Sequence, residues 1–130
     1  MSMERIKDGI ISSIKEQMDY RLENGYVVAE YPSESGKYFC CNGEAQNRWL
    51  TLSMMDQRGL ISYPHRVETH DERSSYDITS SSDLTSFLSA IFSEVTLERT
   101  RAQGYIDEIL AANGESESLA KLNAYINLNT

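Results

Sequence analysis

The chain has 130 residues, and its 40% hydrophobic content is enough to form a buried core without help from metals or disulfides. Twenty acidic and 12 basic residues give a net charge of −8, which opposes binding to a phosphate backbone or to anionic lipid headgroups. These figures predict one small, soluble, acidic domain over residues 1–130 and disfavour nucleic-acid and membrane partners.

The charge is spread along the whole chain. Residues 1–31 carry four basic and six acidic residues, residues 32–82 carry five and seven, and residues 83–130 carry three and seven. No third is basic, and acidity this even does not indicate DNA mimicry. A charged N-terminus with no continuous apolar stretch after it predicts neither a signal peptide nor a transmembrane helix, so we expect a cytoplasmic protein.

An amphipathic helix is predicted from about Ser2 to Glu23. Apolar residues recur there every four positions, opposite a charged side, at Ile6, Ile10, Ile14, Met18 and Leu22. Ser2 can cap the start, and Asn24-Gly25 can supply the left-handed backbone that often ends a helix. The apolar stripe of this helix must therefore pack against another surface of the protein.

Short β-type runs separated by turn residues fill the region from Tyr26 to about Thr79. The candidate strands are Tyr26–Tyr31, Lys37–Cys41, Arg48–Met54, Leu60–Tyr63 with a continuation to Val67, and Tyr76–Thr79. Because the connections are short, consecutive strands are expected to pair as an antiparallel meander of four or five strands. Pro64 is expected at an edge or a strand end, since it cannot donate to the ladder.

The third candidate strand sets the two faces of this predicted sheet. Alternation assigns to the core face Leu50, Leu52 and Met54. The same alternation assigns to the opposite face Trp49, Thr51 and Ser53.

Helical spacing returns after the N-cap residues that run from Ser80 to Asp83. A long helix is expected to continue toward Asn113-Gly114, with a kink or break at Gly104, and a short helix is expected from about Ser118 to Leu128. The predicted fold is therefore α+β: an N-terminal helix, a meander, and two or three C-terminal helices packed on one face of the sheet. The other sheet face stays open for function.

The two cysteines, Cys40 and Cys41, are adjacent. In a reducing compartment they are expected to be free thiols that point to opposite faces of a strand. A redox or metal role would favour a spaced pair or further ligands nearby. We therefore expect no cofactor at these residues.

Motifs for catalysis are sparse. His65 and His70 lie near three carboxylates and form the only cluster with metal-ligand residue types, but a solvated loop is the simpler interpretation. No glycine-rich phosphate loop or nucleophile motif is present in the sequence. We expect neither enzyme activity nor a bound metal.

Aromatic residues concentrate in the predicted strands, at Tyr26, Tyr31, Tyr38, Phe39, Trp49, Tyr63 and Tyr76. Rigid rings bordered by carboxylates suit a protein-binding surface, although cross-strand pairing and a homodimer seam would also use them. The predicted partner-binding residues on the open sheet face and in the adjacent acidic loop are Trp49, Thr51, Ser53, Glu68, Asp71 and Glu72.

Three functions fit these features. The preferred hypothesis is a non-enzymatic binding protein that inhibits or neutralises a protein with a basic surface, as immunity proteins and phage anti-defence inhibitors do. The alternative is a secretion-chaperone-like or structural homodimer. The third is an enzyme with an unrecognised site around His65 and His70.

Overall fold

The computed structural model describes residues 2–129, which form an α+β protein with four α-helices, four short strands and a C-terminal 3-10 turn. Contacts divide the chain into two compact units. The helical unit comprises the chain up to Arg21 and from Thr96 onward, and the mixed unit comprises Leu22–Val95. None of the helices in the described residues has the length and apolar character needed to cross a bilayer. That residues 1–130 act as a single domain stays a prediction.

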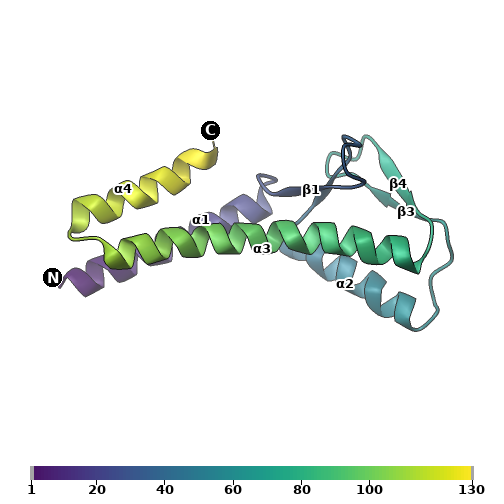
Figure 1. The fold of residues 1–130 in the computed structure, drawn as a ribbon, viewed down its shortest axis with the longest axis horizontal. Coiled ribbons are helices and arrows are strands. Elements are labelled where there is room, and N and C mark those ends of the chain that lie inside the picture. The colour runs from purple at the N-terminus through teal and green to yellow at the C-terminus, as the bar shows by residue number, and fades with distance from the viewer. Residues whose placement is uncertain (1, 130) are drawn as a thin grey trace. The chain divides into compact units, whose positions relative to one another are not determined.

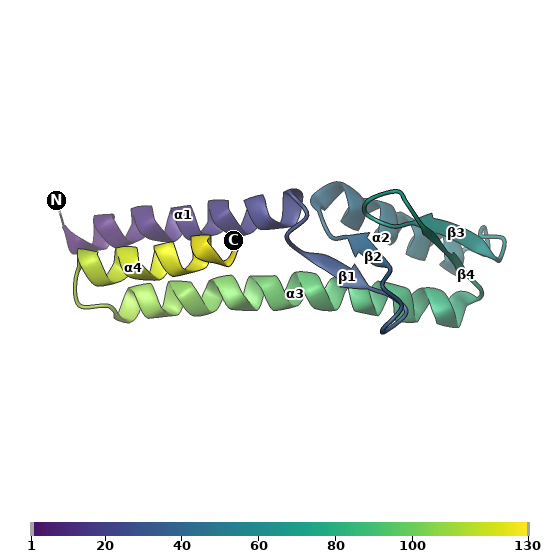
Figure 2. The same cartoon turned by 90° about the horizontal axis from the view of Figure 1, so that it is seen from above.

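The helical unit is built from α1 (Met3–Glu23), the second half of α3 (Ser81–Ala111) and α4 (Glu115–Ile126), which run alongside one another in Figure 2. Their buried side chains form one core: Ile10, Ile14, Ala102, Ile106, Ile109 and Tyr125. The N-terminal helix is therefore confirmed, with its stripe facing inward. Lys7 Nζ donates to the carbonyls of Leu110 and Ala112, at 3.1 and 2.7 Å, and so caps the end of α3.

The predicted break at Gly104 is wrong. α3 passes through it without interruption, because the buried residues Ala102, Ile106 and Ile109 continue the helical apolar stripe on both sides of the glycine. The prediction of C-terminal helices packed on a sheet is also wrong for α4, since α4 contributes to the core of the helical unit, whose described residues contain no strand.

A buried carboxylate connects the three helices of the helical unit. Glu98 on α3 is 1% exposed and forms an ion pair with Arg21 on α1, itself 5% exposed. Glu98 Oε1, the oxygen that pairs with Arg21, also accepts from the Tyr125 hydroxyl on α4 at 3.4 Å. Glu98 Oε2 accepts from Arg101 Nη1 at 3.0 Å. Burial, followed by the nearby Glu98 charge, raises the pKa of Tyr125. The buried charge is thus held by partners from every helix of the unit.

Removing this carboxylate should destabilise the protein strongly. Glu98→Ala removes the carboxylate that neutralises the buried Arg21 and is expected to lower the free energy of unfolding by roughly 3–5 kcal/mol. Glu108→Ala on the same helix is the matched control, because it breaks only the exposed pair with Lys121 and should change the free energy by about 0.5 kcal/mol or less. Urea unfolding followed by circular dichroism measures the free energy of unfolding of both variants. Equal losses in the two variants would contradict the structural role given to Glu98.

The mixed unit contains two β-hairpins, helix α2 and the first half of α3 (Figure 1). Its elements are β1 (Val28–Glu30), β2 (Tyr38–Cys40), α2 (Gly43–Gln57), β3 (His65–Glu68) and β4 (Ser75–Ile78). β1 pairs with β2 and β3 pairs with β4, both antiparallel. The His70 amide donates to the Tyr38 carbonyl at 2.8 Å and connects the hairpins.

An aromatic cluster centred on Phe87 of α3 holds these elements together. The fully buried Phe87 ring makes edge-on contacts with Tyr31, Phe39 and Trp49, with centroids 5.6, 5.0 and 5.1 Å away. These rings come from the end of β1, from β2 and from α2. One side chain on α3 therefore positions three other segments of the mixed unit.

The predicted four- or five-stranded meander is wrong: the described residues contain two separate two-stranded sheets. Residues 60–64 form no strand, and the strand predicted there begins only at His65. Pro64 lies immediately before β3, which confirms its expected place at a strand end. The turn residues expected between the candidate strands do separate β1 from β2 and β3 from β4.

The largest error is the strand predicted over Arg48–Met54, which lies inside helix α2. Asn42, which directly follows the candidate strand Lys37–Cys41, is the N-cap of α2 and accepts from the Ala45 amide at 2.8 Å. The buried side chains of α2 are Ala45, Trp49 and Leu52, which follow helical spacing. The predicted core face is therefore wrong for Leu50 and Met54, which are 50% and 55% exposed.

A carboxylate also organises the corner where β4 meets α3. Asp83 accepts hydrogen bonds from the Tyr31 hydroxyl, from the Tyr76 hydroxyl at 2.7 Å and from the Thr79 amide at 2.9 Å. Ser80 caps the helix by accepting from the Asp83 amide at 3.1 Å, as its N-cap sequence predicts. Burial raises the pKa of Asp83, but these donors outweigh it, and the pKa lies below its ordinary value.

Asp83→Asn should destabilise the protein in a pH-dependent way. Because the folded-state pKa is depressed, the stabilisation is complete above roughly pH 4 and is lost as the pH falls through the folded-state value. We expect a loss of roughly 1–2 kcal/mol at pH 7 that shrinks in acid, measured by urea unfolding from pH 7 to 3. Asp19→Asn, on an exposed surface of α1, is the control, and a pH-independent Asp83→Asn effect would contradict the mechanism.

Candidate binding groove between helix α2 and hairpin β3–β4

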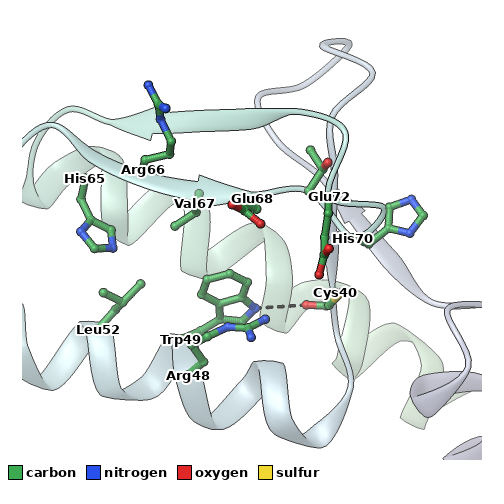
Figure 3. A pocket seen from close by; sticks show the side chains of 11 residues that line it. Cys40, Arg48, Trp49, Leu52, His65, Arg66, Val67, Glu68, His70 and Glu72 are labelled. Carbon is green, nitrogen blue, oxygen red and sulfur yellow. Dashed lines mark hydrogen bonds between the residues drawn. The ribbon is translucent and has the colours of Figure 1, made fainter.

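A groove of about 370 Å³ opens between α2 and the β3–β4 hairpin, with Cys40 of β2 at one end (Figure 3). We call it the α2–β3 groove. The side chains that matter for its chemistry are Arg48, Trp49, His65, Glu68 and Glu72. Leu52 and Val67, both buried, complete an apolar lining. The groove therefore combines an aromatic ring, apolar walls and charges of both signs.

Trp49 is the rigid part of the groove. Its ring nitrogen donates to the Cys40 carbonyl at 3.1 Å, and its ring packs edge-on against Phe87. Only 3% of the residue is exposed. A fixed aromatic side chain of this kind is a suitable anchor for a binding partner because little conformational entropy is lost on contact.

Two carboxylates line the groove opposite α2. Figure 3 shows Glu68 and Glu72 extending from the hairpin toward the side on which Trp49 lies. Both residues are exposed, and neither carboxylate has a hydrogen bond or ion pair within residues 2–129. These charges are therefore available to a ligand. The mixed unit as a whole carries eleven acidic and five basic residues, a balance of −6 out of the total of −8.

Arg48 covers one face of Trp49. Its guanidinium carbon lies 4.9 Å from the ring centroid, which is a cation–π contact between neighbouring residues of α2. Arg66 differs, because its side chain points away from the groove in Figure 3 and pairs with Asp77 at 3.3 Å. His65 projects toward Leu52 at the far end. Of the two arginines that line the groove, Arg48 is the one whose charge lies against the aromatic floor.

The two cysteines are free thiols with different surroundings. Cys40 is half-buried and lines the groove, whereas Cys41 is buried and faces the core. Burial, with a contribution from the Glu94 charge, raises the pKa of Cys41 to about 12, and burial also raises the pKa of Cys40. Both thiols are therefore protonated and weakly nucleophilic at neutral pH.

The predicted sheet face of Trp49, Thr51 and Ser53 does not exist, because all three lie on α2. Trp49 is buried in the groove floor. Thr51 is exposed on the outer side of the helix and donates to the Asn47 carbonyl at 2.9 Å, and Ser53 is half-buried. The correction follows from the helical period of α2, which rotates successive residues to different sides instead of alternating them between two faces.

The predicted acidic loop is the β3–β4 turn, and its three carboxylates have two different roles. Glu68 and Glu72 line the groove together with Trp49. Asp71 instead accepts from the Thr69 hydroxyl at 2.7 Å and from the Arg73 amide at 3.1 Å, which stabilises the turn. These hydrogen bonds lower the pKa of Asp71, with the Thr69 hydroxyl as the main cause. The structure thus brings together three of the six predicted partner-binding residues.

The histidine cluster is not assembled as a metal site in the part of the chain that the structure describes, where no three His, Cys, Asp or Glu side chains converge. His65 and His70 both line the groove, but from opposite ends, and the His70 ring points away from Trp49 in Figure 3. Sequence reasoning missed Arg48 altogether. The signal that could have found it is the helical spacing of Ala45, Trp49 and Leu52, which places Arg48 beside the groove.

Comparison of the chain with protein-family models, with curated proteins and with solved structures finds no match. The geometry of the groove and the charge of the mixed unit therefore carry the functional argument.

Proposed function

We propose that this protein is a non-enzymatic binding protein that inhibits or neutralises a protein partner with a basic surface, in the manner of immunity proteins and phage anti-defence inhibitors. The observation that carries the proposal is the α2–β3 groove, in which a rigid Trp49 lies beside the carboxylates of Glu68 and Glu72. An aromatic anchor within a polar rim is typical of the energetic centre of protein interfaces.

The charge of the mixed unit supports a basic partner. A balance of −6 within Leu22–Val95 would steer a positively charged protein toward the groove and repel acidic ones. Such steering raises the association rate more than the final affinity, and salt screens it. Inhibitors that must capture a harmful protein quickly benefit from this form of recognition.

The proposal predicts a salt-sensitive complex that depends on the groove. The tagged full-length chain should capture a basic protein from a lysate of its own host, and the purified pair should bind about tenfold or more weakly at 300 mM than at 50 mM salt. Glu68→Gln/Glu72→Gln should weaken binding because it removes the two groove charges. Biolayer interferometry measures both effects, and the partner's own activity should fall in the complex.

Glu115→Gln/Glu117→Gln is the matched control, since it removes the same charge from exposed positions in the first turn of α4. It should leave partner binding nearly unchanged. The proposal would be contradicted by capture of an acidic partner, by an affinity that does not change with salt concentration, or by equal losses of binding affinity in the two double variants.

A homodimer is a second candidate function, favoured by the outer side of α2. Leu50 and Met54 are 50% and 55% exposed and lie one turn apart. Glu44 and Arg58 stand at equal sequence distances from Thr51, so two copies of α2 crossing antiparallel at Thr51 would place each Glu44 opposite the other copy's Arg58. Apolar contact flanked by reciprocal ion pairs suits a two-fold interface.

Light scattering during size-exclusion chromatography decides between these states. The homodimer predicts twice the mass of one chain at every concentration, and Met54→Asp should convert it to a monomer. A wild-type monomer across a hundredfold concentration range would eliminate this candidate.

A further inference from the structure

We infer that Arg48 occupies, in the free protein, the place on the Trp49 ring that an arginine side chain of the partner takes in the complex. The inference rests on the proposed function and specifies its recognition chemistry: the α2–β3 groove binds a guanidinium group. Arg48 is then an internal substitute for the ligand, displaced when the partner docks.

The contacts of Arg48 are those of a replaceable group. Its guanidinium carbon lies 4.9 Å from the Trp49 centroid, yet its side chain makes no hydrogen bond or ion pair within residues 2–129. The residue is exposed. A single exposed cation–π contact contributes little, so water or another cation can replace it at small cost.

The groove offers an incoming guanidinium more than it offers Arg48. Glu68 and Glu72 line the same groove and have no partner among the described residues. Arg48 itself forms no ion pair with either carboxylate in the part of the chain that the structure describes. A side chain that enters from outside can stack on Trp49 and pair with one of these carboxylates at the same time.

Arginine fits this site better than lysine. The guanidinium is planar, stacks on an aromatic face and can donate two parallel hydrogen bonds to a carboxylate, whereas an ammonium is a compact and strongly hydrated charge. The buried Leu52 and Val67 add apolar surface for the aliphatic part of the side chain. The chemistry of the groove thus matches an arginine-bearing segment of a protein.

The fluorescence of Trp49, the single tryptophan of the chain, provides a direct readout. Titration of the full-length protein with the peptide acetyl-tetraarginine amide at low salt should give a saturable change. Arg48→Ala should bind the peptide roughly two- to fivefold tighter than Arg58→Ala, because only the first substitution removes the internal competitor. Arg58 is the matched control, since it carries the same charge and lies at the C-terminal end of α2, outside the groove.

Two further comparisons separate recognition from general attraction. Glu68→Gln/Glu72→Gln should weaken peptide binding roughly threefold or more, while Glu115→Gln/Glu117→Gln should have a smaller effect. The tetralysine peptide should bind more weakly than tetraarginine, and a tetracitrulline peptide, which lacks charge, should not bind. Equal affinities of the two arginine variants, equal losses in the two double variants, or equal binding of lysine and arginine would each overturn the inference.

The outcome for the peptide and the outcome for the protein partner are separable. If a basic partner binds with salt sensitivity but Arg48→Ala binds no tighter than Arg58→Ala, the proposed function stands and the role of Arg48 is refuted. If the peptide behaves as expected but no basic protein partner is captured, the groove recognises guanidinium groups and the proposed function fails.

Discussion

The buried stripe along α3 is the constraint on which the rest of the structure depends. One row of side chains, spaced by three or four residues, is buried from end to end: Leu84, Phe87, Ile91, Val95, Glu98, Ala102, Ile106 and Ile109. The part up to Val95 belongs to the core of the mixed unit, and the part from Glu98 belongs to the helical unit. A single amphipathic helix therefore organises both units, each of which buries its own section of the stripe.

The chemistry of the stripe differs between the units. In the mixed unit Phe87 receives three aromatic rings edge-on, so that packing geometry determines where α2 and the β1–β2 hairpin lie. In the helical unit Glu98 is the charged member of the stripe, and its partners must converge on a buried carboxylate. Ring contacts also hold the floor of the α2–β3 groove, because Trp49, which lines the groove, packs edge-on against Phe87.

Particular residues show how far sequence reasoning reached and where it failed. The period of four in α1 is sustained from Ile6 to Leu22, which is more than four turns, so a chance pattern is excluded and the predicted helix is confirmed. The run Arg48–Met54 is too short to separate a period of two from one of 3.6, and β-branched and aromatic residues around it favoured a strand. Glu68 and Glu72 belong to the predicted acidic loop, which the structure shows as the β3–β4 turn, but their position opposite Trp49 depends on a helix that the sequence pattern predicts as a strand.

The amino-acid sequence alone determined the acidity of the chain, the amphipathic character of α1 and α3, the N-cap at Ser80 and the turns that separate paired strands, because each depends on neighbouring residues. Only the tertiary structure decided that Arg48, Trp49, Glu68 and Glu72 line one groove. The reason is physical: residues on α2 and on the β3–β4 hairpin meet only when both elements are packed in the core of the mixed unit, and the shape and burial of that whole core determine this packing.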